Sequence, residues 1–335
     1  MISIHRPLLR LVVFFSLSAL QSFSLFSPGL FSETLTVATY NVNNYLLTTR
    51  VVQGAYRPNC PKPESEKAAL RANIKAINAD IIAIQEMGAL PLLKELLRDL
   101  KRDGVDYPYA ELLESPADPD RHLAVLSRRP FTHVGKHAEL YFKYFGANEL
   151  VKRGLLEVRV ATEAGELALF IVHLKSRLTE RDHPNDPESA ARRAGEATAI
   201  RDCILKIFPN PAAPDARFLI MGDCNDTRAN RPLRALSVRG KTQIATPLPG
   251  GDTRGEVWTY FYAKQDTYTR FDHILVSPAL KKSVQNNVVT IYDGPNVKDA
   301  SDHRPVLVRL NLGKPRNDER PMLHFTPLEP VSFDK

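Results

Sequence analysis

Short polar strings at the ends of apolar runs are the feature that most constrains this sequence. Near the C-terminal end, the string SDHRP at 301–305 places an aspartate beside a histidine between two apolar runs. Four other strings come at or just after the end of an apolar run: TYNVNN at 39–44, IQEMG at 84–88, HLKS at 173–176 and GDCND at 222–226. The apolar runs are predicted strands, so their ends would present carboxylate, amide and imidazole groups. This combination suits a divalent cation and a phosphate group.

The bulk composition is typical of a soluble globular protein. The chain has 335 residues, of which 43% are hydrophobic and 25% are charged. This length permits one large domain or two ordinary ones, and it supports a core without disulfides. The three cysteines leave two alternatives open: a Cys60–Cys203 disulfide in an exported protein, or three unpaired thiols of which two are buried. Their spacing does not indicate a zinc site.

The N-terminal segment has the pattern of a secretory signal. A basic start with Arg6 and Arg10 precedes the apolar stretch 11–20, which is short for a membrane span. We expect a signal peptide within 1–32, cleaved between about Ala19 and Ser32, and a secreted or periplasmic protein. An uncleaved membrane anchor is the alternative. The remaining chain is expected to form one domain over 33–312 and a flexible tail over 313–335.

The formal net charge is +7, and removal of the signal would take away two arginines. A basic balance favours a polyanionic substrate through long-range attraction. The alternative interpretation is that a charge of this size only aids solubility.

The order of predicted elements favours two stacked sheets. Amphipathic helices are predicted over 64–78 and from about 91 to 100, and a longer one starts at Pro187 with Asp186 as its cap. The segment 48–63 is predicted to be a loop. Consecutive strands without helices between them indicate antiparallel pairing, which argues against a single parallel sheet. The predicted strands are 35–40, 80–85, 109–113, 123–127, 154–160, 167–173, 218–222, 272–277, 288–292 and 306–312.

The ordered set of strings resembles the endonuclease/exonuclease/phosphatase superfamily, the deoxyribonuclease-like metal-dependent phosphoesterases. The resemblance runs from about Leu35 to Leu312. It implies an α/β (α+β) fold, a four-layer sandwich in which two mixed β-sheets pack face to face with helices on the outside. It also implies that 33–312 is the catalytic domain, with its site at one edge of the sandwich.

The resemblance assigns metal binding to the acids of two strings. Glu86 matches the family's metal-binding glutamate, and Asp302 is expected to bind metal directly or through water. Asn41 matches an asparagine close to metal and phosphate. Asn43, the third candidate metal ligand, departs from the family pattern, because some members have an aspartate there. Without that carboxylate, the number of metal ions stays open. Hard oxygen ligands favour Mg²⁺ or Mn²⁺.

The resemblance assigns catalysis to five further residues. Asp223 would orient or deprotonate the attacking water, Asn225 would donate a hydrogen bond to the phosphate, and His303 would contact the phosphate. Asp272, in FDHIL, would hold a catalytic imidazole in one tautomer, and its partner is either His173 or His303. His173 is a candidate general acid for the leaving oxygen.

Several cations and aromatic residues have weaker signals. Lys175 and Arg153 are candidate substrate-binding residues, and a solvated position is the alternative for each. Arg192 and Arg193 are expected on a solvated helix face, with a contribution to a basic rim as the alternative. The run YFKYF at 141–145 is predicted to be a half-buried strand, with base stacking or membrane contact as the alternative.

The resemblance also bears on the branch of the superfamily. The HLKS string is similar to branches with two histidines, whereas the abasic-site endonuclease branch has an Asn-x-Tyr string there. The TRFDHIL string differs from the Trp-Cys-Asp-Arg type of inositol phosphatases. We therefore predict a secreted metal-dependent phosphodiesterase, an endonuclease acting on nucleic acid. The alternatives are a sphingomyelinase-like enzyme on membrane lipid, a phosphomonoesterase, and, more remotely, a catalytically silent binding domain. No protein partner is implied, and a monomer is expected.

Overall fold

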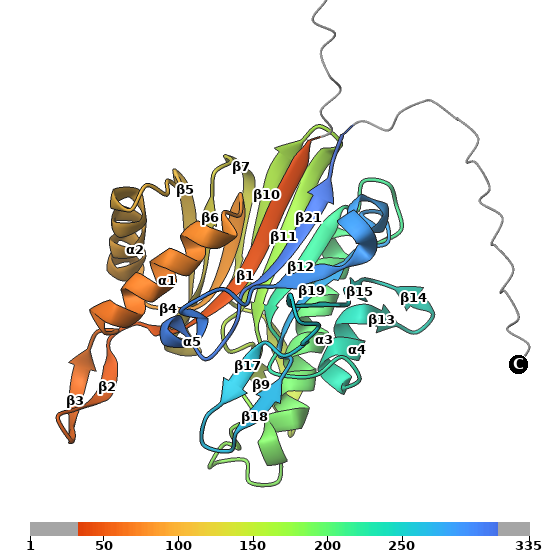
Figure 1. The fold of residues 1–335 in the computed structure, drawn as a ribbon. Helices are drawn as coiled ribbons and strands as arrows, with labels where there is room; N and C mark the ends of the chain where they lie inside the picture. Colours follow the sequence, from red (N-terminus) through yellow and green to blue (C-terminus); the bar gives the residue numbers. More distant parts are fainter. Residues whose placement is uncertain (1–32, 314–335) are drawn as a thin grey trace, which may run out of the picture. The chain divides into compact units, whose positions relative to one another are not determined.

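The fold consists of two large mixed sheets (Figure 1). A computed structural model describes residues 33–313, so the predicted signal peptide and the predicted tail beyond Gly313 lie outside the described residues. The seven-stranded sheet has the order β16 (Gly250–Gly251), β20 (Val289–Ile291), β21 (Val306–Asn311), β1 (Thr34–Tyr45), β4 (Ile81–Met87), β6 (Asp118–Ser127) and β5 (Tyr109–Ser115). The six-stranded sheet has the order β15 (Thr246–Pro247), β19 (Asp272–Val276), β12 (Phe218–Asp223), β11 (Gly165–His173), β10 (Leu155–Thr162) and β7 (Phe131–His137).

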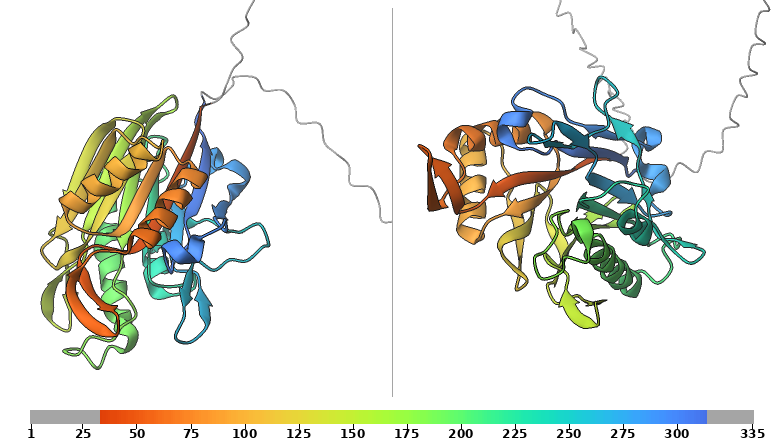
Figure 2. Two further views of the ribbon diagram at one scale, coloured as in Figure 1. Left: turned by 60° about the vertical axis from the view of Figure 1, so that its left-hand side comes forward. Right: turned by 90° about the horizontal axis from the view of Figure 1, so that it is seen from below.

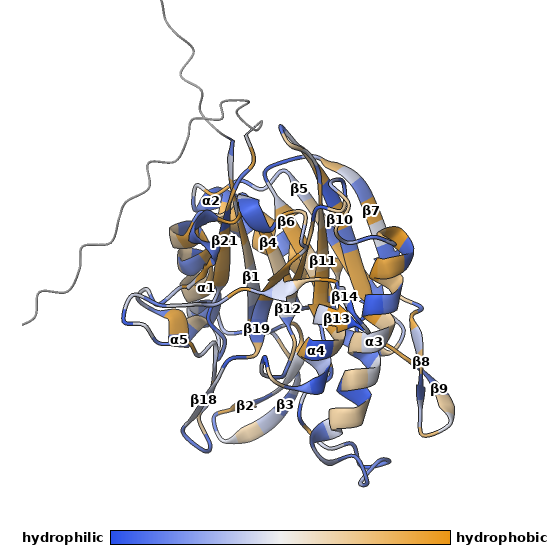
Figure 3. Cartoon of the chain, turned by 90° about the vertical axis from the view of Figure 1, so that its right-hand side faces the viewer, coloured by the Kyte–Doolittle hydropathy of each residue, from blue (hydrophilic) through white to orange (hydrophobic). Residues whose placement is uncertain are grey.

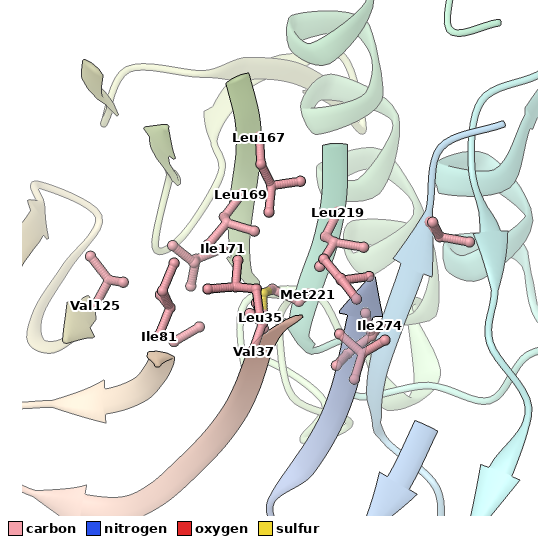
Figure 4. Close-up of a cluster of buried hydrophobic side chains, with 14 of the residues drawn as sticks. Leu35, Val37, Ile81, Val125, Leu167, Leu169, Ile171, Leu219, Met221 and Ile274 are labelled. Atoms are coloured by element: carbon pink, nitrogen blue, oxygen red, sulfur yellow. The ribbon is translucent and has the colours of Figure 1, made fainter. Parts of the chain in front are cut away.

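Three apolar clusters divide the fold into four layers. The cluster between the sheets joins Leu35, Val37 and Ile81 of the first sheet to Leu169 and Leu219 of the second (Figure 4). A second cluster packs the first sheet against helices α1 (Glu64–Ile77) and α2 (Leu90–Arg102). A third packs the second sheet against α3 (Ala190–Ile207) and α4 (Arg231–Ser237). The helices cover the two outer faces (Figure 2), which confirms the predicted four-layer sandwich.

Apolar side chains follow the layers of the sandwich. Strands such as β11 and β12 are apolar on both faces because each face is covered, one by the other sheet and one by helices (Figure 3). Polar residues gather on outer helix faces and on the loops at the strand ends. No helix among residues 33–313 is long and apolar enough to cross a membrane.

Four small hairpins and one short helix lie outside the main sheets. The hairpins are β2 (Thr48–Val52) with β3 (Ala55–Cys60), β8 (Tyr141–Tyr144) with β9 (Ala147–Leu150), β13 (Val238–Arg239) with β14 (Thr242–Gln243), and β17 (Tyr260–Tyr262) with β18 (Thr267–Thr269). Helix α5 (Val297–Ala300) precedes the SDHRP string. The prediction of a loop over 48–63 was therefore wrong. Thr48–Val52 is rich in β-branched residues, and the positive φ angles of Gln53 and Gly54 close a tight turn.

Two other expectations need correction. The long helix starts at Ala190 and not at Pro187, because Glu188 and Ser189 both have positive φ angles, 55° and 47°. Asp186 still caps this helix: its carboxylate accepts the backbone N–H groups of Ala191 and Arg192. All three cysteines are unpaired, and two of them, Cys203 and Cys224, are buried. The alternative of a Cys60–Cys203 disulfide is therefore not observed.

Candidate active site

Sheet register brings the polar strings to one edge. Strands β1 and β4 are parallel, as are β11 and β12, so their carboxyl ends point the same way. His173 at the end of β11 pairs with Asp223 at the end of β12, and Asp223 pairs with Asp272 at the start of the antiparallel strand β19. Paired residues share a face of the sheet, so the three side chains lie next to one another.

His303 is the imidazole that Asp272 holds. Asp272 Oδ2 lies 2.8 Å from His303 Nδ1, and both side chains are buried. This contact resolves the choice between His173 and His303 as the partner of Asp272. With Nδ1 engaged, His303 Nε2 faces the site and lies 3.8 Å from Asp223 Oδ2.

The two histidines have opposite electrostatic environments. Burial, together with the positive charge of Arg153, lowers the pKa of His173 well below its ordinary value. Burial also opposes the charged form of His303, but Asp272 and Asp223 outweigh it and raise the pKa of His303 well above its ordinary value. Hence His173 is neutral and His303 is an imidazolium near neutral pH.

Asp223 is the centre of the hydrogen-bond network. Its Oδ2 accepts from Asn41 Nδ2 at 3.0 Å and lies 3.5 Å from His173 Nε2. Its Oδ1 accepts the backbone N–H of Asn225 at 2.8 Å, an Asx turn that fixes the carboxylate. Burial raises the pKa of the Asp223 carboxyl, and the charge on His303 opposes that shift.

A backbone irregularity presents Glu86 to the site. The register of β4 shifts between Ile84 and Met87, and Glu86 has a φ of 63°, which is rare for a residue with a Cβ atom. Irregularities of this kind re-aim side chains beside active sites. Glu86 Oε2 accepts the backbone N–H of Asn44 at 2.9 Å, and Oε1 lies 3.4 Å from Asn41 Nδ2.

These side chains open into a cleft of about 970 Å³. Its catalytic wall consists of Asn43, Glu86, His173, Asp223, Asn225, Asp302 and His303. The rest of its lining is polar and carries several acids and the cations Arg121, Lys152, Arg153, Lys175, Arg181 and Arg192. The cleft is large enough for an extended substrate and too polar for an apolar one.

A comparison with family models matches residues 38–303 to the endonuclease/exonuclease/phosphatase family. The chain belongs to the endonuclease/exonuclease/phosphatase family. Similar solved structures share its fold at low identity. A truncated TDP2 from Caenorhabditis elegans is 16% identical, with a TM-score of 0.53, over 83% of this chain and 97% of that one. A beta toxin of Staphylococcus aureus is 16% identical, with a TM-score of 0.57, over 82% and 99%.

A third similar structure is a family protein from Bacteroides thetaiotaomicron, 17% identical with a TM-score of 0.54 over 83% of this chain and 97% of that one. A comparison with curated proteins gave no match. Family membership confirms the expected fold class and makes the chain a phosphoric ester hydrolase, and the family is divalent-metal dependent.

Two carboxylates of this family member fit a metal ion. Glu86 and Asp302 both line the cleft, and within residues 33–313 neither pairs with a lysine or arginine. Burial raises the pKa of Asp302. The positive charge of His303 opposes this shift, and the negative charge of Glu86 adds to it. A cation between the two acids would relieve their repulsion. Asn43 lies on the same wall, but its Oδ1 accepts from Asn44 Nδ2.

A second acidic group is better suited to proton transfer. Asp223, Asp272 and His303 offer ligand atoms within 4.8 Å of one another. Since His303 Nδ1 already bonds to Asp272, this group forms a carboxylate–imidazole relay that leaves only Asp223 and one ring nitrogen free. Glu86 and Asp302 are therefore the better candidate metal ligands.

The two predicted substrate cations reach the cleft but are engaged with their own surroundings. Lys175 Nζ donates to the carbonyls of Ser176 and Leu178. Arg153 Nε lies 2.8 Å from Asp118 Oδ2, and both residues are buried. In this conformation both side chains form part of the rim. To bind a phosphate, each would have to make a further contact or leave its present partners.

Sequence reasoning placed Arg192 and Arg193 on a solvated face, and this was wrong: both are buried. Arg193 Nε bonds to Asp226 Oδ2 at 2.9 Å, and its Nη1 donates to the carbonyls of Lys175 and Glu188. Glu196, one turn later, accepts the backbone N–H of Lys175 at 2.7 Å. Arg193 and Glu196 are charged residues three positions apart on a helix face that is otherwise apolar, and this pattern could have predicted that they are buried.

Two hydroxyls missed by the sequence reasoning fix the relay. Thr259 Oγ1 accepts the backbone N–H groups of Phe271 and Asp272, both at 3.0 Å. Ser301 Oγ accepts the N–H of His303 and donates to the carbonyl of Asn41. Isolated hydroxyls carry no sequence signal of this kind, since Ser and Thr are common in strands and loops alike.

Proposed function

We propose that this protein is a Mg²⁺- or Mn²⁺-dependent phosphodiesterase that acts as an endonuclease on nucleic acid. The observation that carries the proposal is the Asp272–His303 pair beside Asp223, at the edge of a cleft whose acids Glu86 and Asp302 have no lysine or arginine partner among the described residues. Family membership supports phosphoester hydrolysis in general, and a large polar cleft in which Arg121 and Arg181 have no ion pair among the described residues favours a polymeric anion.

The residues divide the chemistry as follows. Asp223 accepts the proton of the attacking water, with Asn41 fixing its Oδ2 atom. Asp272 holds His303 so that its Nε2–H donates to a phosphoryl oxygen beside that water. Asn225 fixes the base: its backbone N–H donates to Asp223 Oδ1, and its Nδ2 donates to the carbonyl of Leu174 at 2.9 Å and lies 3.3 Å from Asp223 Oδ2. Contact of this amide with the phosphate, the role expected from the sequence, would require it to leave those partners. A divalent cation held by Glu86 and Asp302 would neutralise charge on the phosphoryl and leaving oxygens.

His173 takes a different role from the one the sequence resemblance favoured. Its Nε2 lies within 3.5 Å of Asp223 Oδ2 and 4.0 Å of Glu86 Oε1, next to the base. In-line displacement puts the leaving oxygen on the side of the phosphorus opposite the attacking water. A histidine beside the base therefore favours positioning of the water or of a phosphoryl oxygen over protonation of the leaving group.

Plasmid nicking tests the proposed function. The mature chain from about Glu33 is incubated with supercoiled DNA and Mg²⁺, Mn²⁺ or chelator. Nicking that needs metal, is lost in His303→Ala and persists in His133→Ala supports the proposal. The matched control changes a histidine of strand β7 that is remote from the cleft residues. Nicking that survives in His303→Ala, or no nicking with either metal, contradicts it.

Exposed apolar side chains on two hairpins favour a second candidate, a lipid phosphodiesterase. Val51 and Tyr56 on the β2–β3 hairpin are 60% and 82% exposed, and Tyr141 and Phe145 at β8 are 58% and 63% exposed. The β2–β3 hairpin projects from the body of the fold (Figure 2). Such side chains can enter a membrane interface. Hydrolysis of phospholipid vesicles that falls in Tyr56→Ala, with no nicking of DNA, would favour this candidate.

We also propose that the protein is exported and acts as a monomer outside the cytoplasm. The basic start and apolar stretch before residue 33 support export, and a formal charge of +7 supports solubility without a partner. N-terminal sequencing of protein recovered from the periplasm or medium tests export. An intact residue 1 in a membrane fraction would instead indicate an anchor.

A further inference from the structure

We infer that a second pocket, formed by Trp258, Phe261, Lys298 and their neighbours, binds the nucleotide next to the scissile phosphate. This inference rests on the proposed endonuclease function and names a subsite for its substrate. The pocket is separate from the large cleft and has a volume of about 310 Å³. That is at the lower end of small-ligand pockets, roughly 300–1,000 Å³, and suits one base with its sugar.

The pocket meets the catalytic centre at two residues. Asn43 and Asp302 line both the pocket and the large cleft. The backbone N–H of Phe261 donates to the carbonyl of Asp302 at 2.9 Å, and Tyr260 forms a β-bridge with His303. A chain whose phosphate lies between Asp302 and Asp223 would therefore place its adjoining nucleotide at this pocket.

Two aromatic rings, Trp258 and Phe261, line the pocket, and Tyr268, which is outside its lining, packs against both. Phe261 stacks on Tyr268 with ring centroids 4.6 Å apart, and Trp258 meets Tyr268 edge to face at 4.9 Å. Tyr268 is 50% exposed. Stacking of bases on such rings does not depend on sequence, which suits an enzyme that cleaves many sites.

Lys298 decides which class of ligand fits. Its ammonium lies over the rings of Phe261, Tyr268 and Trp258, at 4.7, 5.6 and 5.8 Å from their centroids. The side chain is exposed, and its three partners are rings, so it is free to swing from the aromatic face to an anion. A cationic ligand, such as a choline group, would meet this charge and be repelled. A nucleotide offers a neutral base to the rings and a phosphate to Lys298.

The other charges at the pocket do not reverse this preference. Glu66 pairs with Lys62 at 2.9 Å. Arg304 is buried, lies over the Trp258 ring at 4.1 Å and pairs with Asp252, so it stiffens the floor of the pocket. Asp299 is exposed, so water and salt screen its charge. Asp302 is the proposed metal ligand.

The chain offers a built-in probe, because Trp258 is its only tryptophan. A ligand in the pocket changes the environment of this ring, so its fluorescence reports occupancy without catalysis. The mature chain is titrated in chelator with a short single-stranded oligonucleotide, and in parallel with phosphocholine. We expect saturable quenching by the oligonucleotide and none by phosphocholine.

Variants identify the contacts. Phe261→Ala should weaken oligonucleotide binding about tenfold or more, as expected for the loss of one stacked base. Lys298→Ala should weaken binding and lower the slope of log affinity against log salt by about one. Tyr109→Ala, an exposed aromatic residue of strand β5, is the matched control and should bind as the unmodified chain does.

The outcomes separate the subsite from the proposed function. Plasmid nicking without quenching, or quenching unaffected by Phe261→Ala, overturns the subsite and leaves the endonuclease proposal standing. Quenching by the oligonucleotide without any nicking supports the subsite and contradicts the catalytic proposal. Quenching by phosphocholine in preference to the oligonucleotide overturns the assignment to a nucleotide.

Discussion

At the scale of single residues, neighbouring charges give chemically identical side chains different roles. His303 bonds to Asp272 and faces Asp223, whereas His173 Nδ1 is buried without a partner among the described residues. A ring between two carboxylates is held in one tautomer and stays charged. Asp272 therefore matters through His303, although Asp272 itself does not line the cleft.

Asp272→Asn should abolish most activity without unfolding the protein. The amide cannot stabilise the imidazolium of His303, and it permits the wrong tautomer, so kcat should fall about 10²–10⁴-fold. The measurement is kcat for metal-dependent hydrolysis, with circular dichroism as the check on folding. Asp215→Asn, on a loop before β12, is the control and should be silent. Retention of more than a tenth of kcat in Asp272→Asn would remove the relay from the mechanism.

One glycine of the catalytic string is required by close backbone approach. Gly222 has a φ of +145°, and a Cβ atom there would lie 1.9 Å from the carbonyl oxygen of Val172 on β11. Gly222→Ala should lower the free energy of unfolding by at least about 2 kcal/mol, because the central strand must shift. Urea denaturation measures the change. Gly104 also has a positive φ, but a Cβ atom there would meet no other atom within 4 Å. Gly104→Ala should therefore lower the free energy of unfolding by only about 1 kcal/mol. Equal losses at both positions would refute the steric explanation.

At the scale of elements, helix α3 organises the catalytic loops from behind the sheet. Arg193 bonds to Asp226 of the GDCND string and to the carbonyl of Lys175 of the HLKS string. Glu196 accepts the N–H of Lys175 and that of Lys152. These buried charged groups connect three segments of the cleft wall, so the helix couples folding of the sandwich to geometry of the site.

Arg193→Met should therefore affect both stability and catalysis. The substitution removes one charged partner of buried Asp226, which keeps Arg177 at 2.9 Å, so the expected cost is about 1.5–3 kcal/mol of unfolding free energy. Because the two strings move apart, kcat should fall more than KM rises, and Arg193→Lys should restore part of kcat. Urea denaturation and steady-state kinetics measure the two effects. Arg201→Met, on the same helix with an ion pair to Asp202, is the matched control. A variant that is destabilised but has wild-type kcat would show a purely structural role.

Strands β7 and β10 carry an ion pair that makes stability depend on pH. Interactions with Cys203 and with Glu157 raise the pKa of His137 to about 9 from the usual 6.5. Burial opposes ionisation of Glu157, yet His137 and Arg159 outweigh it and lower the pKa of that carboxyl. A raised histidine pKa stabilises the fold fully below about pH 6.5, and the contribution is lost as pH rises through about 9.

His137→Gln should therefore destabilise the fold most at mildly acidic pH. At pH 6 the expected loss is on the order of 2 kcal/mol, since one pKa unit corresponds to about 1.4 kcal/mol and the ring is partly solvated. At pH 9.5 the variant and the unmodified chain should unfold at nearly the same urea concentration. Denaturation curves at both pH values provide the measurement, and a difference that does not change with pH would contradict this account.

At the scale of the whole molecule, some features could be predicted from the sequence and others could not. The apolar runs marked the strands, and strings such as GDCND marked the strand ends, because local patterns report local structure. The sequence could not say that Asp272 pairs with His303, since sheet register fixes this contact. Buried Arg193 was missed for a related reason: its partner Asp226 lies 33 residues away along the chain. Sequence patterns therefore do not identify partners that are distant along the chain.

The charge of the whole molecule does not describe its cleft. The chain has a formal net charge of +7, but the rim cations Arg153 and Arg192 are already paired with acids. Within the described part of the chain, Arg121 and Arg181 are the cleft arginines with no ion pair. Binding of nucleic acid should therefore release few counterions despite the basic composition.

The small number of unpaired cations in the cleft predicts a shallow salt dependence of binding. Plotted as log affinity against log salt concentration, oligonucleotide binding in chelator should have a slope of about −2 to −3, with Lys298 as the third contact. Arg181→Ala should reduce the slope by about one, and Lys241→Ala on the β13–β14 turn should leave it unchanged. Fluorescence anisotropy of a labelled oligonucleotide from about 50 to 300 mM salt measures the slope. A slope of −6 or steeper would mean that the overall charge, and not the cleft, dominates binding.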